Sequence, residues 1–194
     1  MANWCSNSVA FEGNEIALEH VKLEFIKMQL RENEENCGQL PEFISDESRG
    51  YFFDIVWEEG DCIFNYQTKW SPNTEVLKQI AERFKVDFIL DYEEMGNQIY
   101  GRTIFSNGEL TDIYLEDEDF EKYRYDEEAE TYHFEGETFD SDYEILETLL
   151  DRKVKNQFNT IKNQTHYANQ FFQTTCQFEP YRRFANHIQS NHRK

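Results

Sequence analysis

The first part of the chain changes from a strand pattern to a helix pattern. From Trp4 to Phe11 apolar and polar residues alternate, and this period of two predicts a strand that closes near Gly13. Asn14 is a suitable helix N-cap. Apolar residues then recur at intervals of three and four, at Leu18, Val21, Phe25 and Met28. The sequence therefore predicts a helix over about 14–31, followed by a loop over 36–50, where glycine, proline and serine are common.

The same alternation of patterns follows in the next segment. Aromatic and β-branched runs at 51–57 and 62–68 predict two strands joined by a turn at 58–61. A capped amphipathic pattern predicts a helix over 74–85, and residues 87–92 predict a further strand. The order β-α-β-β-α-β is that of ferredoxin-like folds. We therefore expect an α+β domain, in which both helices pack on one face of an antiparallel sheet.

The pattern continues with hairpins and a last helix. Strand runs at 99–105 and 110–115 flank Ser106-Asn107-Gly108, a typical hairpin turn, and 120–125 with 131–134 predict a second, acidic hairpin. From Ser141 apolar residues follow a helical period again, at Ile145, Leu146, Leu149, Leu150, Phe158 and Ile161. We expect three parts, which are a ferredoxin-like domain at 1–115, an acidic hairpin extension at 116–140, and a C-terminal helix with a basic polar tail at 141–194.

Charge divides the chain unevenly. Residues 1–150 carry 37 acidic and 11 basic side chains, a net charge of −26, whereas the last 44 residues carry a net charge of +6. A body of this charge repels nucleic acid and membrane surfaces and attracts basic proteins. The tail could instead bind nucleic acid if its cations were clear of the acidic body. Those cations are Arg152, Lys153, Lys155, Lys162, Arg182 and Arg183.

The compartment follows from what the chain lacks. The start at Met1 has no basic and apolar leader, and no stretch reaches the length of a membrane span of about 18 residues. The four cysteines contain no C-x-x-C pair, which disfavours a zinc knuckle or a redox dithiol. We therefore expect a cytoplasmic protein with reduced thiols.

The acidic belt is the first candidate for function. Seventeen acidic residues lie between Glu109 and Glu147, against only Lys122 and Arg124. On a strand, residues i and i+2 share one face about 6.7 Å apart, so such a row resembles the charge spacing of a nucleic-acid backbone. The candidate interaction surface comprises Glu116, Asp117, Glu118, Asp119, Glu121, Asp126, Glu127 and Glu128. The alternative is a face that only keeps the protein soluble.

A candidate ligand site lies at the end of the sheet. Trp4, Lys69 and Trp70 could form a pocket in which the indole rings stack on a ligand and the lysine supplies charge. The alternative is that both tryptophans are packing anchors. Asn3, Asn7 and Asn73 would then cap nearby turns and helices through local bonds.

No residue pattern in the sequence indicates a catalytic site. Cys5 has no histidine at a spacing that suggests a nucleophile pair, and the acidic run 116–119 lacks the mid-loop glycine of a calcium loop. Carboxylates are too abundant for any one pair to be singled out, and no glycine-rich phosphate loop is present. We expect no catalytic residue, cofactor or metal site.

Two short motifs resemble a known family. Asn3-Trp4-Cys5-Ser6-Asn7 opens the chain, and Phe64-Asn65-Tyr66-Gln67-Thr68-Lys69-Trp70-Ser71-Pro72 precedes a helix. Tyr92-Glu93-Glu94-Met95-Gly96 and Gly101-Arg102 follow. In this order the motifs resemble the YubB ferredoxin-like family of uncharacterised phage and plasmid proteins, over about residues 1–115. The resemblance implies a ferredoxin-like fold and an intracellular accessory protein of a mobile element.

These observations favour a non-enzymatic interaction protein whose acidic surface binds a basic protein, such as one that itself binds nucleic acid. Two alternatives stay open. One is an enzyme or small-ligand-binding domain with its site at the sheet end near Trp4 and Trp70. The other is a protein that binds nucleic acid through the basic tail.

Overall fold

The computed structural model describes residues 3–45, 50–57 and 62–164, with the side chains up to residue 159. The chain forms two units, 1–151 and 152–194. The expected turn at 58–61 and the tail beyond residue 164, with Arg182 and Arg183, lie outside the described residues.

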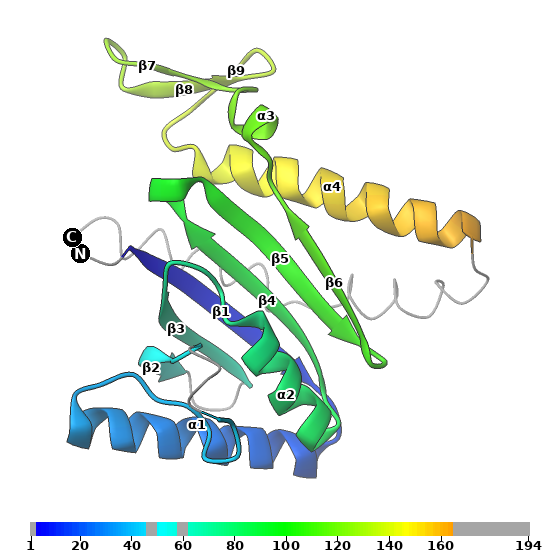
Figure 1. Cartoon of the computed structure of the whole chain (residues 1–194). Coiled ribbons are helices and arrows are strands. Elements are labelled where there is room, and N and C mark those ends of the chain that lie inside the picture. The colour runs from blue at the N-terminus through cyan, green and yellow to red at the C-terminus, as the bar shows by residue number, and fades with distance from the viewer. Residues whose placement is uncertain (1–2, 46–49, 58–61, 165–194) are drawn as a thin grey trace. The chain divides into compact units, whose positions relative to one another are not determined.

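A six-stranded antiparallel sheet organises the first unit (Figure 1). Its strands are β1 (Trp4–Glu12), β2 (Phe53–Trp57), β3 (Ile63–Lys69), β4 (Asp87–Glu94), β5 (Ile99–Ser106) and β6 (Glu109–Tyr114). Their spatial order is β2-β3-β1-β4-β5-β6. The first four strands have the ferredoxin-like arrangement, and the hairpin β5–β6 extends the sheet beside β4. The predicted fold class is confirmed.

Helices α1 (Glu15–Glu35) and α2 (Thr74–Phe84) cover one face of this sheet. Asn14 begins α1 as predicted, since its side chain accepts the backbone N–H of Ala17. Because β1 alternates, Val9 and Phe11 point into the core between sheet and helices. The Phe25 ring of α1 stacks on Phe64 of β3, with 4.0 Å between ring centroids. Phenylalanine contacts thus join α1 to the sheet, while aliphatic residues of α2, among them Leu77 and Ile80, pack in the same core.

Helix α1 is longer at its C-terminal end than the sequence predicted. The acidic segment after Arg31 stays helical to Glu35, and Asn36 ends the helix in the left-handed conformation. Glu32 gains a tertiary partner there, because its carboxylate accepts the backbone N–H groups of Asp54 and Ile55 on the edge strand β2. A contact between distant segments, which no local pattern shows, lengthens this helix.

The helix α4 (Tyr143–Gln164) begins within the first unit, and its residues up to Asp151 pack on the other face of the sheet. Tyr100 and Arg102 of β5 point to that face, since their neighbours Gly101 and Thr103 face the core under α1 and α2. The Tyr100 hydroxyl donates to Glu147 at 2.7 Å, and Arg102 donates to Asp151 at 3.3 Å. Arg102 also pairs with Asp91 of β4 at 2.5 Å.

The segment after β6 forms a small module, defined here as residues 116–142 and called the acidic module. It contains the short helix α3 (Asp117–Phe120) and a three-stranded sheet of β7 (Arg124–Asp126), β8 (Thr131–Phe134) and β9 (Glu137–Phe139). The predicted strand at 120–125 is wrong in its first half, because Phe120 ends α3 and is buried. Strand β9 was not predicted, since three residues are too few for a periodic signal.

Candidate functional site

The acidic run at the start of the acidic module does not form a continuous row of charges. Asp119 is 3% exposed; its carboxylate accepts the backbone N–H of Glu116 at 2.9 Å and the Lys122 ammonium group at 2.6 Å. A helical turn also replaces the strand spacing of 6.7 Å on which the predicted row rested. Asp119 is therefore a structural residue that holds the turn of α3, and it was wrongly assigned to the interaction surface.

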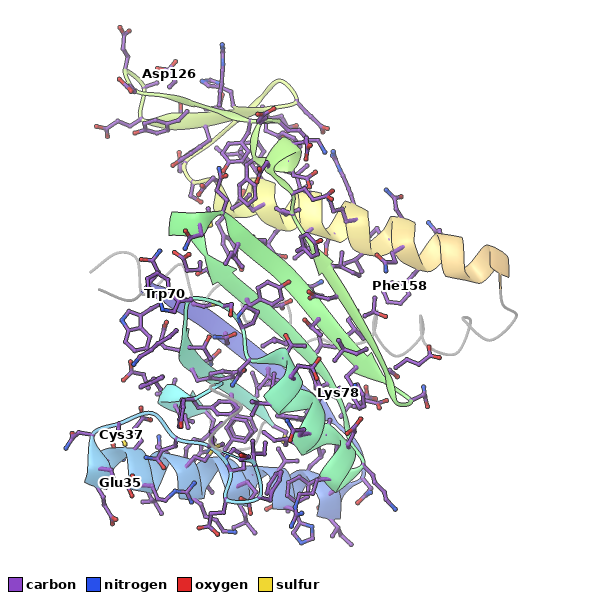
Figure 2. All side chains as sticks on the ribbon, viewed as in Figure 1. Glu35, Cys37, Trp70, Lys78, Asp126 and Phe158 are labelled. Carbon is purple, nitrogen blue, oxygen red and sulfur yellow. The ribbon has the colours of Figure 1, made fainter. Side chains whose placement is uncertain are left out.

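Asp126 has a structural role as well. It lies at the tip of the β7–β8 hairpin (Figure 2), where its carboxylate accepts the backbone N–H groups of Glu128 and Ala129 at 3.0 and 3.1 Å. These two bonds lower the pKa of Asp126. His133 lies 3.8 Å away across the hairpin. The other candidate carboxylates, Glu116, Asp117, Glu118, Glu121, Glu127 and Glu128, are exposed.

Aromatic side chains line one face of the three-stranded sheet. Tyr125, Tyr132 and Phe139 lie directly opposite one another on β7, β8 and β9, so they form one cross-strand row. The rings of Tyr125 and Tyr132 are 4.9 Å apart, and Tyr125 is 49% exposed. Polar residues, including His133 and Thr138, occupy the opposite face. The acidic module thus combines exposed carboxylates with an aromatic row that ends in an exposed tyrosine.

The second candidate site lies where β1 begins and β3 ends. Trp4 and Lys69 are directly opposite in the register and point to the sheet face away from α1 and α2. Phe53 of β2 completes the group, since its ring meets Trp4 edge to face at 5.0 Å. The Lys69 ammonium group lies 5.0 Å from the Phe53 ring centroid and 5.9 Å from that of Trp4. No sequence signal pointed to Phe53, because α1 and a long loop separate β2 from β1 along the chain.

A glycine positions Phe53. A Cβ atom added to Gly38 would lie 2.3 Å from the Phe53 ring, so the ring rests directly on the backbone of Gly38. A larger residue would displace the ring from its place beside Trp4 and Lys69.

Trp70 occupies a strained turn beside this group. Its φ is +72°, and Ser71 N–H donates to the carbonyl of Lys69 at 2.9 Å, which closes a γ-turn around Trp70. A γ-turn with positive φ is rare, and such strain costs about 1–3 kcal/mol. The indole remains 52% exposed rather than buried, and Figure 2 shows it at the end of the sheet. Packing of the indole in the core is therefore not what maintains this conformation.

Buried hydrogen bonds hold the turn in place. The Thr68 hydroxyl donates to the carbonyl of Ser71 at 2.8 Å, and Asn7 in turn donates to Thr68 at 2.9 Å. On the other side, the backbone N–H of Trp70 donates to the carbonyl of Asn3 at 2.9 Å. The asparagines are structural, as one reading of the sequence proposed. Asn7 also bonds locally to the carbonyl of Cys5 at 2.8 Å, but the bonds to Thr68 and Trp70 join segments that are distant in the sequence.

Asn73 shows the same departure from local capping. It precedes α2 but its side chain makes no cap bond. Instead it accepts the Tyr66 hydroxyl at 2.7 Å and donates to the carbonyl of Gly50 at 2.9 Å. The expected local cap is wrong here, and the residue ties the loop before β2 to the sheet. Trp4, 47% exposed, is likewise no buried anchor.

Cys5 lies below this end of the sheet and is unsuited to nucleophilic attack. It is fully buried, and burial raises the pKa of its thiol to about 12, so it stays protonated near neutral pH. Among the described side chains, which end at residue 159, no three histidine, cysteine or carboxylate groups gather as a metal site. In the same part of the chain no helix is long and apolar enough to cross a bilayer.

Comparison with known proteins adds a family match to this geometry. No curated protein and no solved structure matches the chain. Residues 52–135, which run from β2 to β8, match a family described as the ferredoxin-like domain in Api92-like protein. The match includes the quoted segments 64–72, 92–96 and 101–102 and extends into the acidic module, but it stops short of β1 and the opening motif with Trp4. Strand order and family match agree that the chain carries a ferredoxin-like domain similar to that of Api92-like protein.

Proposed function

We propose that the protein is a non-enzymatic interaction protein whose acidic module binds a basic protein. The observation that carries the proposal is the composition of this module. The module carries exposed carboxylates, among them Asp117, Glu118, Glu127 and Glu128, together with a sheet face that ends in the exposed ring of Tyr125. Tyrosine supplies interface contact area, and carboxylates steer a basic partner toward it.

The net charge of the chain and its proposed mobile-element setting both indicate the kind of partner. The whole chain carries a net charge of −20, so encounter with a basic protein is favoured and encounter with nucleic acid is opposed. A partner that itself binds nucleic acid would fit such a surface. The proposed setting is a mobile element of the phage or plasmid type, which supports this choice because such elements meet host nucleases.

The experiment compares two double variants in the full chain. Glu127→Gln with Glu128→Gln neutralises exposed carboxylates of the acidic module that have no structural role in the fold. Glu34→Gln with Glu82→Gln is the control, because it removes the same charge from exposed positions on α1 and α2. A basic partner isolated from host lysate should bind the first variant about tenfold more weakly than the parent. The control should bind like the parent.

Two further measurements decide the nature of the contact. Affinity should fall steeply with salt, since the screening length is about 8 Å at physiological ionic strength. Duplex DNA should compete for the same partner. Equal affinities of the two variants, or a partner that holds DNA and this protein together, would contradict the proposal and leave the acidic module as a solubilising surface.

A further inference from the structure

The sheet end at Trp4 presents a cation among aromatic rings in a body of strongly negative net charge. Lys69 lies beside the rings of Trp4 and Phe53 at 5.9 and 5.0 Å. In the described part of the chain no carboxylate lies within ion-pair distance of its ammonium group, although the chain carries 39 acidic residues. Since no described carboxylate pairs with it, the Lys69 ammonium group can accept an anionic group from outside.

Two exposed indole rings belong to direct neighbours of this cation, one across the sheet and one along the chain. Trp4 is opposite Lys69 on the neighbouring strand, and Trp70 follows it directly. Both rings are about half exposed, whereas the phenylalanines of the helix-covered core are buried. Exposed indole faces bind planar rings by stacking.

The rings are also held in place before any ligand arrives. Phe53 rests on Gly38 and meets the Trp4 ring edge to face. The strained turn at Trp70 is fixed by the buried bonds of Thr68 and by the bond to Asn3. Strain of this kind persists where the surrounding structure enforces it, and it is concentrated at functional sites. A rigid site loses less entropy when it binds a ligand.

From this arrangement we infer that Trp4, Phe53, Lys69 and Trp70 bind a ligand that combines a planar ring with an anionic group. The ring stacks on an indole, and the anion pairs with the Lys69 ammonium group. Nucleoside monophosphates and aromatic carboxylates share this chemistry. The site shares no residue with the acidic module and binds through a cation rather than through carboxylates. Its test is therefore independent of the function proposed above.

The chain has three tryptophans, which give an internally controlled measurement. In the full chain with ¹⁵N-labelled tryptophan, the indole N–H signals of Trp4 and Trp70 report on the site. Trp57 is the reference, because it lies at the far end of β2 from Phe53 and pairs with Phe64. Four probes are titrated at constant ionic strength, which are adenosine monophosphate, N-acetyltryptophan, adenosine and inorganic phosphate.

The expected result is a saturable shift of the Trp4 and Trp70 signals with adenosine monophosphate or N-acetyltryptophan, while the Trp57 signal stays in place. The stronger of these two probes identifies the source of the ligand. Adenosine lacks the anion and phosphate lacks the ring, so both should bind more weakly. One stacked ring and one exposed ion pair supply roughly millimolar affinity, so titration to about 10 mM is sufficient.

Two variants test the roles of the residues. Lys69→Gln should weaken binding about fivefold, the upper value of an exposed ion pair, while Lys78→Gln on α2 changes the net charge equally and should have no effect. Trp70→Asn tolerates positive φ and should lose the stacking while the unfolding transition is retained. Absence of any shift, equal affinity for adenosine and its monophosphate, or equal effects of the two lysine variants would overturn the inference.

Discussion

The helix-covered side of the sheet and the acidic module both contain aromatic rows, but different forces hold them. Phe25 is fully buried and stacks on Phe64 at 4.0 Å, whereas Tyr125 meets Tyr132 at 4.9 Å and stays 49% exposed. The turns of the acidic module depend instead on two carboxylates, Asp119 and Asp126. We infer that apolar burial stabilises the first region and that local charged hydrogen bonds shape the second.

The largest effect should come from the core. Phe25→Ala removes a ring that touches Phe64 and Phe52, and it leaves a cavity under α1. The free energy of unfolding should fall by about 4 kcal/mol, measured by urea denaturation. Tyr125→Ala removes a ring of similar size from the acidic module and should change it by about 1 kcal/mol or less, because that ring is half exposed. Equal losses would refute the contrast between the two regions.

Arg102 provides the next test, since it joins the sheet to α4 by charge rather than by apolar contact. Its guanidinium group is buried and pairs with Asp91 and Asp151. Arg102→Met leaves these carboxylates without their cation and should lower the free energy of unfolding by about 3 kcal/mol. Arg124→Met, at an exposed position on β7, is the control. If the Arg102→Met variant proves as stable as the parent, the ion pairs only offset their desolvation.

The sequence predicted the ferredoxin-like elements well because their signals are local and repeated. The alternation in β1 and the helical period around Phe25 each involve several residues that all indicate the same face. The end of α1 at Glu35 was missed because Glu32 finds its partners on a strand that is distant in the sequence. Local patterns therefore predict elements, while tertiary bonds decide where some of them end.

In the candidate sites too, some residues could be predicted from the sequence and others depend on tertiary structure. Trp4 and Lys69 were chosen from composition, and the structure places them directly opposite each other. Phe53 and the strained turn at Trp70 could not be predicted, since one needs the strand order and the other has no side-chain signal. In the acidic module, composition indicated a uniform surface, but buried Asp119 is indistinguishable in sequence from exposed Asp117.

Asp119 allows a test of that distinction. Asp119→Ala removes the acceptor of the Glu116 N–H and of the Lys122 ammonium group, so the turn of α3 should lose about 1–2 kcal/mol. Hydrogen exchange of the amides at 116–122 measures this local loss. Asp117→Ala, in the same turn but exposed, should alter exchange by only a few tenths of a kcal/mol. Equal protection of these amides in the two variants would contradict the structural role of Asp119.

A smaller effect concerns Glu147 on α4. Burial, with Asp91 nearby, raises its pKa above the usual 4.5. The folded state then binds a proton at a higher pH than the unfolded state, so Glu147 makes the protein less stable as pH rises through the raised value. Glu147→Gln keeps the bond from Tyr100 and should abolish this component. Urea denaturation at a series of pH values should show the parent losing stability relative to the variant above pH 4.5; a constant difference contradicts the assignment.

The smallest effect should have the opposite sign and lie in the acidic module. The backbone N–H groups of Ala129 and Glu128 lower the pKa of Asp126 below its usual 3.8. In this case the unfolded hairpin binds the proton more readily, so the β7–β8 turn is stable above pH 3.8 and loosens as pH falls through the lowered value. The protection of the Glu128 and Ala129 amides, which is their exchange rate relative to the intrinsic rate at each pH, should therefore fall in acid in the parent. The Asp126→Asn variant has no carboxylate to titrate and should show no such fall, whereas the same loss of protection in both proteins would place its origin outside this carboxylate.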